Sequence, residues 1–86
     1  MRDPNSNLRK ILSVLWKERP NPGNYKLLIS VLEGVLSDRQ IYYGVNKLKY
    51  FGIVTVVINE NGEREISIKK NVEAKTEELL LEANLI

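Results

Sequence analysis

The sequence contains no cysteine and no histidine. Disulfide bonds, zinc sites built on cysteine or histidine, and catalysis by either side chain are therefore excluded. No apolar run approaches the roughly 20 residues that a membrane-spanning helix needs, and the start MRDPNSN is unlike a signal peptide. We therefore expect a cytoplasmic protein without a metal or a cofactor.

Other absences argue against catalysis of any kind. The sequence has no glycine-rich phosphate-binding loop, and the carboxylates Glu33, Asp38 and Glu60 show no paired spacing. Without histidine, no nucleophile can be matched with a general base. We therefore expect that the protein is not an enzyme. No part of the chain resembles a ligand-sensing domain, so we expect no small-molecule ligand.

Size and charge point to one small globular domain. At 86 residues, 43% hydrophobic and 28% charged, the chain is near the size at which one core is just sufficient. The net charge is only +2, but it is unevenly placed. Residues 1–58 carry nine Lys/Arg against four Asp/Glu (net +5), and residues 59–86 carry four against seven (net −3). The pattern indicates a basic body followed by an acidic segment.

The most informative segment is LSDRQIYYGVNKLKYFGIV, residues 36–54. Ser37 and Gln40 form a capping box, which predicts a helix over 37–51 that ends at Gly52. An apolar stripe at helical spacing would be buried, and it comprises Ile41, Val45, Leu48 and Phe51. The opposite, exposed face would carry Arg39, Tyr42, Tyr43, Asn46 and Tyr50. Gly44 lies on the flank of the stripe, which favours close packing by another helix over a kink.

Two helices are expected before this segment. The first spans 7–18, with Asn5 or Ser6 as its cap, and the second spans 25–33 after a proline- and glycine-containing loop. Only about four residues then lead to Ser37, with Gly34 as a left-handed C-terminal residue. This tight connection predicts a helix-turn-helix.

A hairpin is expected next, from strands at 54–58 and 65–68. A two-residue Asn61-Gly62 turn would mix the apolar and polar faces of the hairpin. A three-residue loop of Glu60, Asn61 and Gly62 instead aligns all the apolar residues on one face, so we predict that register. The aligned residues are Val54, Val56, Ile58, Ile66 and Ile68.

The chain is expected to end in a helix over 72–84 with Asn71 as its cap. We predict that residues 1–70 form the main domain and that residues 71–86 form a dimerisation helix. Its apolar residues follow a coiled-coil-like spacing and extend over much of the circumference. The predicted dimer interface comprises Val72, Thr76, Leu79, Leu80, Ala83 and Ile86.

This order of elements resembles the winged helix-turn-helix family, over roughly residues 7–70. The resemblance rests on a capped helix, spaced aliphatic residues and a Gly-aliphatic-Val entry to the hairpin, namely Ser37, Ile41, Val45, Leu48, Gly52, Ile53 and Val54. It implies an α+β, mainly α fold of three helices, a hairpin wing and a C-terminal helix. The sequence departs from the family at the wing tip, where Glu60 and Glu63 replace basic residues and leave Arg64 as the nearby cation.

The resemblance implies that the helix at 37–51 enters the DNA major groove. The implied DNA contacts are Ser37, Arg39, Gln40, Tyr42, Tyr43, Asn46, Lys47 and, in the wing, Arg64. By side-chain geometry, Arg39 suits guanine, and Gln40 or Asn46 suits adenine. Tyrosine hydroxyls more often bind phosphate. Alternatively, the tyrosines only cover neighbouring surface or contact another protein.

Three functions remain open from the sequence. The first is sequence-specific binding of double-stranded DNA as a homodimer, in the role of a transcriptional repressor. The second is a centromere-binding adaptor, similar to those of tubulin-like plasmid or prophage partition systems, which would hold a filament protein as its partner. The third is a winged-helix protein-interaction module that does not bind DNA.

Overall fold

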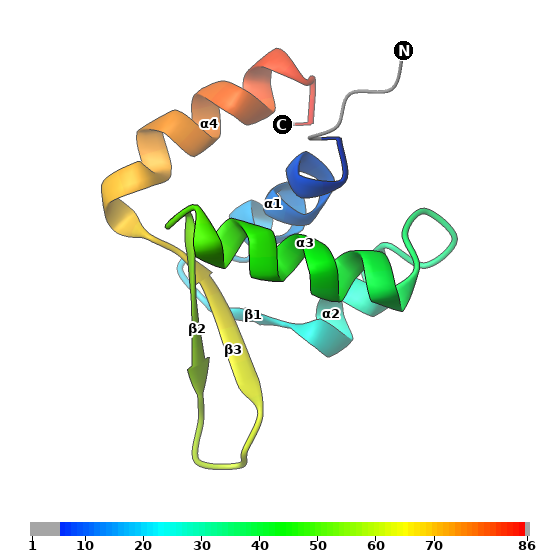
Figure 1. Cartoon of the computed structure of the whole chain (residues 1–86). Coiled ribbons are helices and arrows are strands. Elements are labelled where there is room, and N and C mark those ends of the chain that lie inside the picture. Colours follow the sequence, from blue (N-terminus) through cyan, green and yellow to red (C-terminus); the bar gives the residue numbers. More distant parts are fainter. Residues whose placement is uncertain (1–5, 86) are drawn as a thin grey trace.

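The computed structural model describes residues 6–85. Within this range the elements follow in the order α1 (Ser6–Glu18), β1 (Gly23–Asn24), α2 (Tyr25–Val31), α3 (Asp38–Tyr50), β2 (Val54–Ile58), β3 (Arg64–Ile68), the 3₁₀ turn η1 (Lys70–Val72) and α4 (Glu73–Glu82). Figure 1 shows α3 lying across α1 and α2, the β2–β3 hairpin projecting from these helices, and α4 on the other side of α1. The expected α+β, mainly α class is confirmed.

One core joins the helices to the sheet. Each of α1, α2, α3, β2, β3 and α4 contributes buried apolar side chains to it, and the loop before α3 contributes Leu36. Its fully or almost fully buried members include Ile11, Leu12, Leu28, Ile41, Leu48, Ile66 and Leu80. No helix within residues 6–85 is both long enough and apolar enough to cross a membrane.

Close contact between α1 and α3 depends on Gly44. A Cβ atom at this position would lie 2.5 Å from Ile11 Cδ1 and 3.4 Å from Leu8 Cδ2. The first separation is shorter than carbon atoms allow, so a side chain at position 44 would force the two helices or Ile11 to move. The predicted close packing at Gly44 is therefore confirmed.

Local hydrogen bonds set the starts of α2 and α3. The Ser37 hydroxyl oxygen accepts from Gln40 N at 3.1 Å, and Gln40 Oε1 accepts from Ser37 N at 2.8 Å, so the predicted capping box is confirmed. In α2, Asn24 Oδ1 accepts from Leu27 N at 2.7 Å, a cap that the sequence reasoning missed. Between the helices, Gly34 has φ +80°, as predicted.

The sheet has the strand order β1-β3-β2 and is antiparallel. Val56 pairs with Ile66 and Ile58 pairs with Arg64, which confirms the register predicted from a three-residue loop. Gly62 has φ +79°, as the bulged loop requires. Ile58 is nevertheless 65% exposed, because the hairpin extends beyond the helices that cover its base.

The third strand, β1, was not predicted. Gly23 pairs with Ile66 and Asn24 pairs with Glu65, within the segment that the sequence indicated as a loop. A two-residue strand is too short to show alternation, and it exists here because β3 offers a partner edge.

α4 differs from the expected helix at its start and in the face that it buries. The predicted cap at Asn71 is wrong, because Asn71 lies inside η1 and the N-cap position is Val72, without a side-chain cap. Thr76 and Leu80 are 2% and 0% exposed within the chain itself. These two residues of the predicted dimer interface are therefore buried within the chain itself. Ile86 lies outside the described residues.

Candidate nucleic-acid interface

The two faces of α3 are sharply divided. Ile41, Gly44, Val45 and Leu48 are buried. The predicted contact residues along the helix, Arg39, Tyr42, Tyr43, Asn46 and Lys47, are all exposed. Phe51 is a correction to the predicted buried stripe: it is the C-cap residue and is 57% exposed. Its ring meets that of Tyr50 edge to face, with centroids 5.8 Å apart.

At the N-terminus of α3, the capping box occupies two of the predicted DNA contacts. The Ser37 hydroxyl and Gln40 Oε1 each accept a backbone hydrogen bond. Bidentate recognition of adenine needs both the oxygen and the nitrogen of an amide side chain. At Gln40 this recognition would compete with the cap, so Asn46 is the better placed of the two amides. Arg39, between the cap residues, is exposed.

On one flank of α3, Tyr42 stacks on Tyr25 at the start of α2. The ring centroids are 4.3 Å apart and the planes are 28° apart. Burial raises the pKa of the Tyr25 hydroxyl above its ordinary value of 10.0, the Arg64 guanidinium opposes this rise, and Tyr42 adds to it. The Tyr25 hydroxyl is therefore protonated at neutral pH and able to donate a hydrogen bond.

A groove between α2, α3 and the wing begins at this pair of rings. It measures about 490 Å³, and its lining includes Tyr25, Lys26, Tyr42, Glu63 and Arg64. The structure thus brings together Tyr42 and Arg64, which the sequence analysis named separately. Sequence reasoning gave no role to Tyr25, because only the fold places the start of α2 beside the middle of α3.

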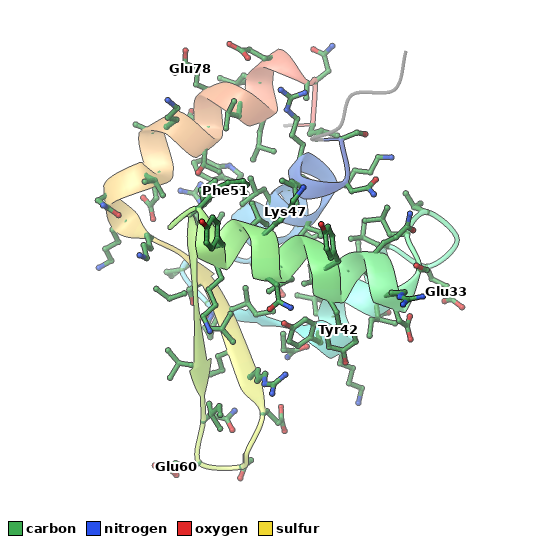
Figure 2. The ribbon with its side chains drawn as sticks, in the orientation of Figure 1. Glu33, Tyr42, Lys47, Phe51, Glu60 and Glu78 are labelled. Atoms are coloured by element: carbon green, nitrogen blue, oxygen red, sulfur yellow. The ribbon has the colours of Figure 1, made fainter. Side chains whose placement is uncertain are left out.

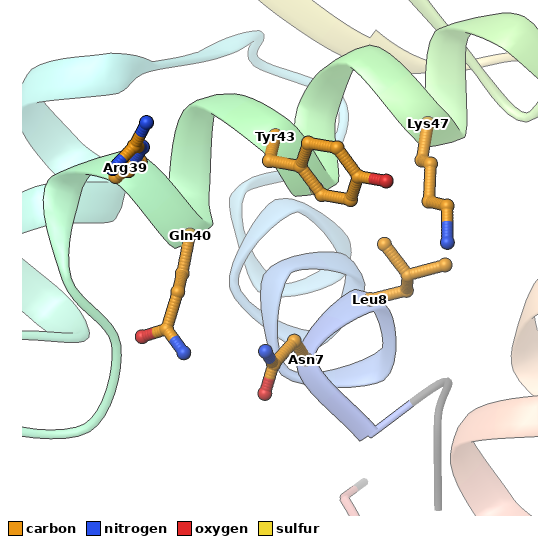
Figure 3. A pocket seen from close by; sticks show the side chains of 7 residues that line it. Asn7, Leu8, Arg39, Gln40, Tyr43 and Lys47 are labelled. Atoms are coloured by element: carbon orange, nitrogen blue, oxygen red, sulfur yellow. The ribbon is translucent and has the colours of Figure 1, made fainter.

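On the opposite flank, a second hollow of about 270 Å³ lies between α3 and the start of α1. Figure 3 shows Tyr43 and Lys47 above Leu8, with Gln40 and Asn7 on the neighbouring side. The Lys47 ammonium lies 5.4 Å from the centroid of the Tyr43 ring, within the range of a cation–π contact. Arg39 also lines this hollow, so it contains two cations.

The tip of the wing is ordered and acidic. Asn59 Oδ1 accepts from the backbone N–H groups of Asn61 and Glu63, each at 2.9 Å, which holds the turn. Glu60 lies at the outermost end of the hairpin (Figure 2), and Glu60 and Glu63 are both exposed. Two carboxylates at the tip oppose contact with phosphate groups.

Solved structures share this arrangement of elements. With a TM-score of 0.75 and 11% identity, 92% of this chain covers 55% of BpsR from Bordetella bronchiseptica, whose DNA binding is regulated by 6-hydroxynicotinic acid. With a TM-score of 0.75 and 14% identity, 93% of it covers 54% of a MarR-family transcriptional regulator from Rhodococcus sp. RHA1. F-93 of SSV1 gives a TM-score of 0.68 at 16% identity, with 98% and 93% of the two chains covered.

The chain has the winged helix-turn-helix fold. This winged helix spans about half the length of BpsR and of the Rhodococcus regulator. No protein-family model and no curated protein sequence matches it. In this fold, α2 and α3 form the helix-turn-helix, α3 has the position of the recognition helix, and β2–β3 is the wing.

Proposed function

We propose that the protein binds double-stranded DNA sequence-specifically as a homodimer, through α3, and that it acts as a transcriptional repressor. The observation that carries the proposal is the exposed side of α3. Arg39, Tyr43 and Asn46 project from a helix whose other face is fully packed and whose start is held by a capping box. Such a rigid support suits the reading of bases.

The dimensions of the helix fit this function. An α-helix with its side chains is about 10–12 Å across, and the major groove is about 12 Å wide. Within the groove, Arg39 can donate two hydrogen bonds to guanine and Asn46 can pair with the edge of adenine. The Tyr43 hydroxyl can donate to phosphate, which positions the protein without reading sequence.

Two solved structures of this fold support a role in regulation. BpsR binds DNA, and the Rhodococcus protein is a transcriptional regulator. A repressor of this size would act by occupying a promoter site, which needs no activity beyond DNA binding.

A homodimer is proposed because one module of this size makes few base contacts, and two copies on a two-fold site double them. The contact between the two copies would be made by residues 71–86 together with the end of α3. A mainly apolar hollow of about 270 Å³ lies between α1, α4 and the end of α3; its lining includes Phe51, Ile53 and Leu79, together with Arg9. We define Phe51, Ile53, Leu79, Ala83 and Val72 as the proposed dimer surface, which omits the buried Thr76 and Leu80.

The test is a binding titration by fluorescence anisotropy, with duplexes selected from a random pool, at increasing salt. A phosphate-contacting dimer should lose affinity steeply, with a slope of about −0.9 per phosphate contact in a plot of log affinity against log salt. A protein-interaction module would bind no duplex even at low salt, and that result would contradict the proposal. Selected sites that are single palindromes support a repressor, whereas arrays of direct repeats would indicate a partition adaptor.

A further inference from the structure

The two hollows beside α3 lie on opposite flanks of the helix. The wing-side groove is lined by Tyr42 and the α1-side hollow by Lys47. These residues are five positions apart, which at 3.6 residues per turn is about 140° around the helix. Figure 2 shows Tyr42 on the side of α3 toward α2 and Lys47 on the side toward α1.

Each hollow also contains two positively charged side chains. Lys26 of α2 and Arg64 of β3 line the wing-side groove, against one carboxylate from Glu63. Arg39 and Lys47 of α3 line the α1-side hollow, without a carboxylate among its lining residues. The exposed side of α3 therefore lies between two positively charged hollows.

A helix in the major groove has a phosphodiester backbone on each side. Because the groove is about 12 Å wide and the helix about 10–12 Å across, each flank of the helix meets a different DNA strand. Resting on the DNA binding proposed above, we propose that the two hollows seat phosphates of opposite strands. Lys26, Arg64 and the Tyr25 hydroxyl bind the phosphate on the wing side, and Lys47 binds the phosphate on the α1 side.

In the wing-side groove, Tyr25 is placed to donate a hydrogen bond to the proposed phosphate. Stacking on Tyr42 fixes its ring between α2 and α3, and its hydroxyl lies within the electrostatic reach of Arg64. A protonated phenol beside a guanidinium offers a neutral donor and a charged donor to the same phosphate oxygens. The contact of Tyr42 with Tyr25 also links α3 to the wing-side phosphate site. The DNA strand on the wing side is thereby positioned together with α3.

The experiment combines variants of the full chain with modified duplexes. Lys26→Ala, Arg64→Ala and Lys47→Ala are each titrated on the selected duplex, and then on duplexes in which one phosphate of a half-site is replaced by a neutral methylphosphonate. Lys75→Ala, an exposed lysine on α4, is the matched control. Each of the three variants should reduce the magnitude of the salt slope, by up to about 1.8 because a homodimer loses the phosphate contact in both half-sites, and Lys75→Ala should leave it unchanged.

The methylphosphonates assign each hollow to a strand. Lys26→Ala and Arg64→Ala should each reduce the loss of affinity caused by a methylphosphonate on one strand of the half-site, because other donors to that phosphate remain. Lys47→Ala should abolish the loss of affinity caused by a methylphosphonate on the other strand. Tyr25→Phe keeps the stacked ring, and it should weaken binding to the same wing-side position without changing the salt slope.

The outcomes separate this inference from the proposed function. If the wild-type protein binds no duplex at low salt, DNA binding itself fails. DNA binding stands but the two-strand placement is overturned in either of two cases. In the first, all three variants change the effect of methylphosphonates on the same DNA strand. In the second, no variant changes the effect of any methylphosphonate. If Tyr25→Phe leaves the affinity for the duplex unchanged, the Tyr25 hydroxyl does not bind the wing-side phosphate.

Discussion

Leu80 and Leu81 are neighbours in α4 with opposite surroundings, and replacing each by alanine tests where this helix belongs. Leu80 is 0% exposed and is part of the common core, whereas Leu81 is 54% exposed. If α4 is a structural part of the domain, Leu80→Ala removes a buried side chain and leaves a cavity against α1. If α4 serves only dimerisation, the two leucines should be of similar importance to the folding of one chain.

The expected magnitude is large for a domain of this size. A fully buried Leu→Ala change costs about 2–5 kcal/mol. At about 0.05–0.15 kcal/mol per residue, the 86 residues give a total free energy of unfolding of roughly 4–13 kcal/mol. For small domains each kcal/mol shifts Tm by about 4–8 °C, so a cost of about 3 kcal/mol lowers Tm by roughly 12–24 °C. Leu81→Ala should stay within about 0.5 kcal/mol of the wild type.

The measurement is thermal and urea unfolding followed by circular dichroism, for the wild type and both variants. Dissociation of a dimer lowers apparent stability at low concentration, so each protein is unfolded over a range of concentrations. The difference between Leu80→Ala and the wild type should persist at every concentration. Equal Tm values for Leu80→Ala and Leu81→Ala would refute the assignment of Leu80 to the core, and with it the packing of α4 on α1.

Three further predictions follow from the proposed interface. Arg39→Ala should cost about 1–3 kcal/mol on the preferred duplex and reduce the affinity ratio between preferred and scrambled duplexes; an unchanged ratio means that Arg39 reads no base. Replacing Glu60 and Glu63 by lysine should strengthen binding to all duplexes and steepen the salt slope, and weaker binding would reveal a specific role for the acidic wing tip. Phe51→Asp or Leu79→Asp should convert the proposed dimer to a monomer, as measured by light scattering, because a charge in an apolar interface is costly; a dimer that persists in both variants excludes the proposed surface.

The features that the sequence determined depend on residues close together along the chain. The capping box joins Ser37 and Gln40, three positions apart, and the hairpin register follows from alternation and a loop of Glu60, Asn61 and Gly62. Interactions of this range are set by backbone geometry and hydrogen bonding within one or two turns. For the same reason, the buried and exposed faces of α3 could be predicted from the periodicity of its residues, except at Phe51, where the helix ends.

Tertiary structure decided the features that depend on distant partners. The strand β1 forms because β3 lies beside it, and Tyr25 joins the candidate interface because folding places it on Tyr42. In α4 the apolar residues extend over much of the circumference, so periodicity could not show which of them face α1. Packing buries Thr76 and Leu80 and leaves Leu81 exposed. A sequence pattern shows how apolar a surface is, but which part of it loses contact with water depends on the elements that fold against it.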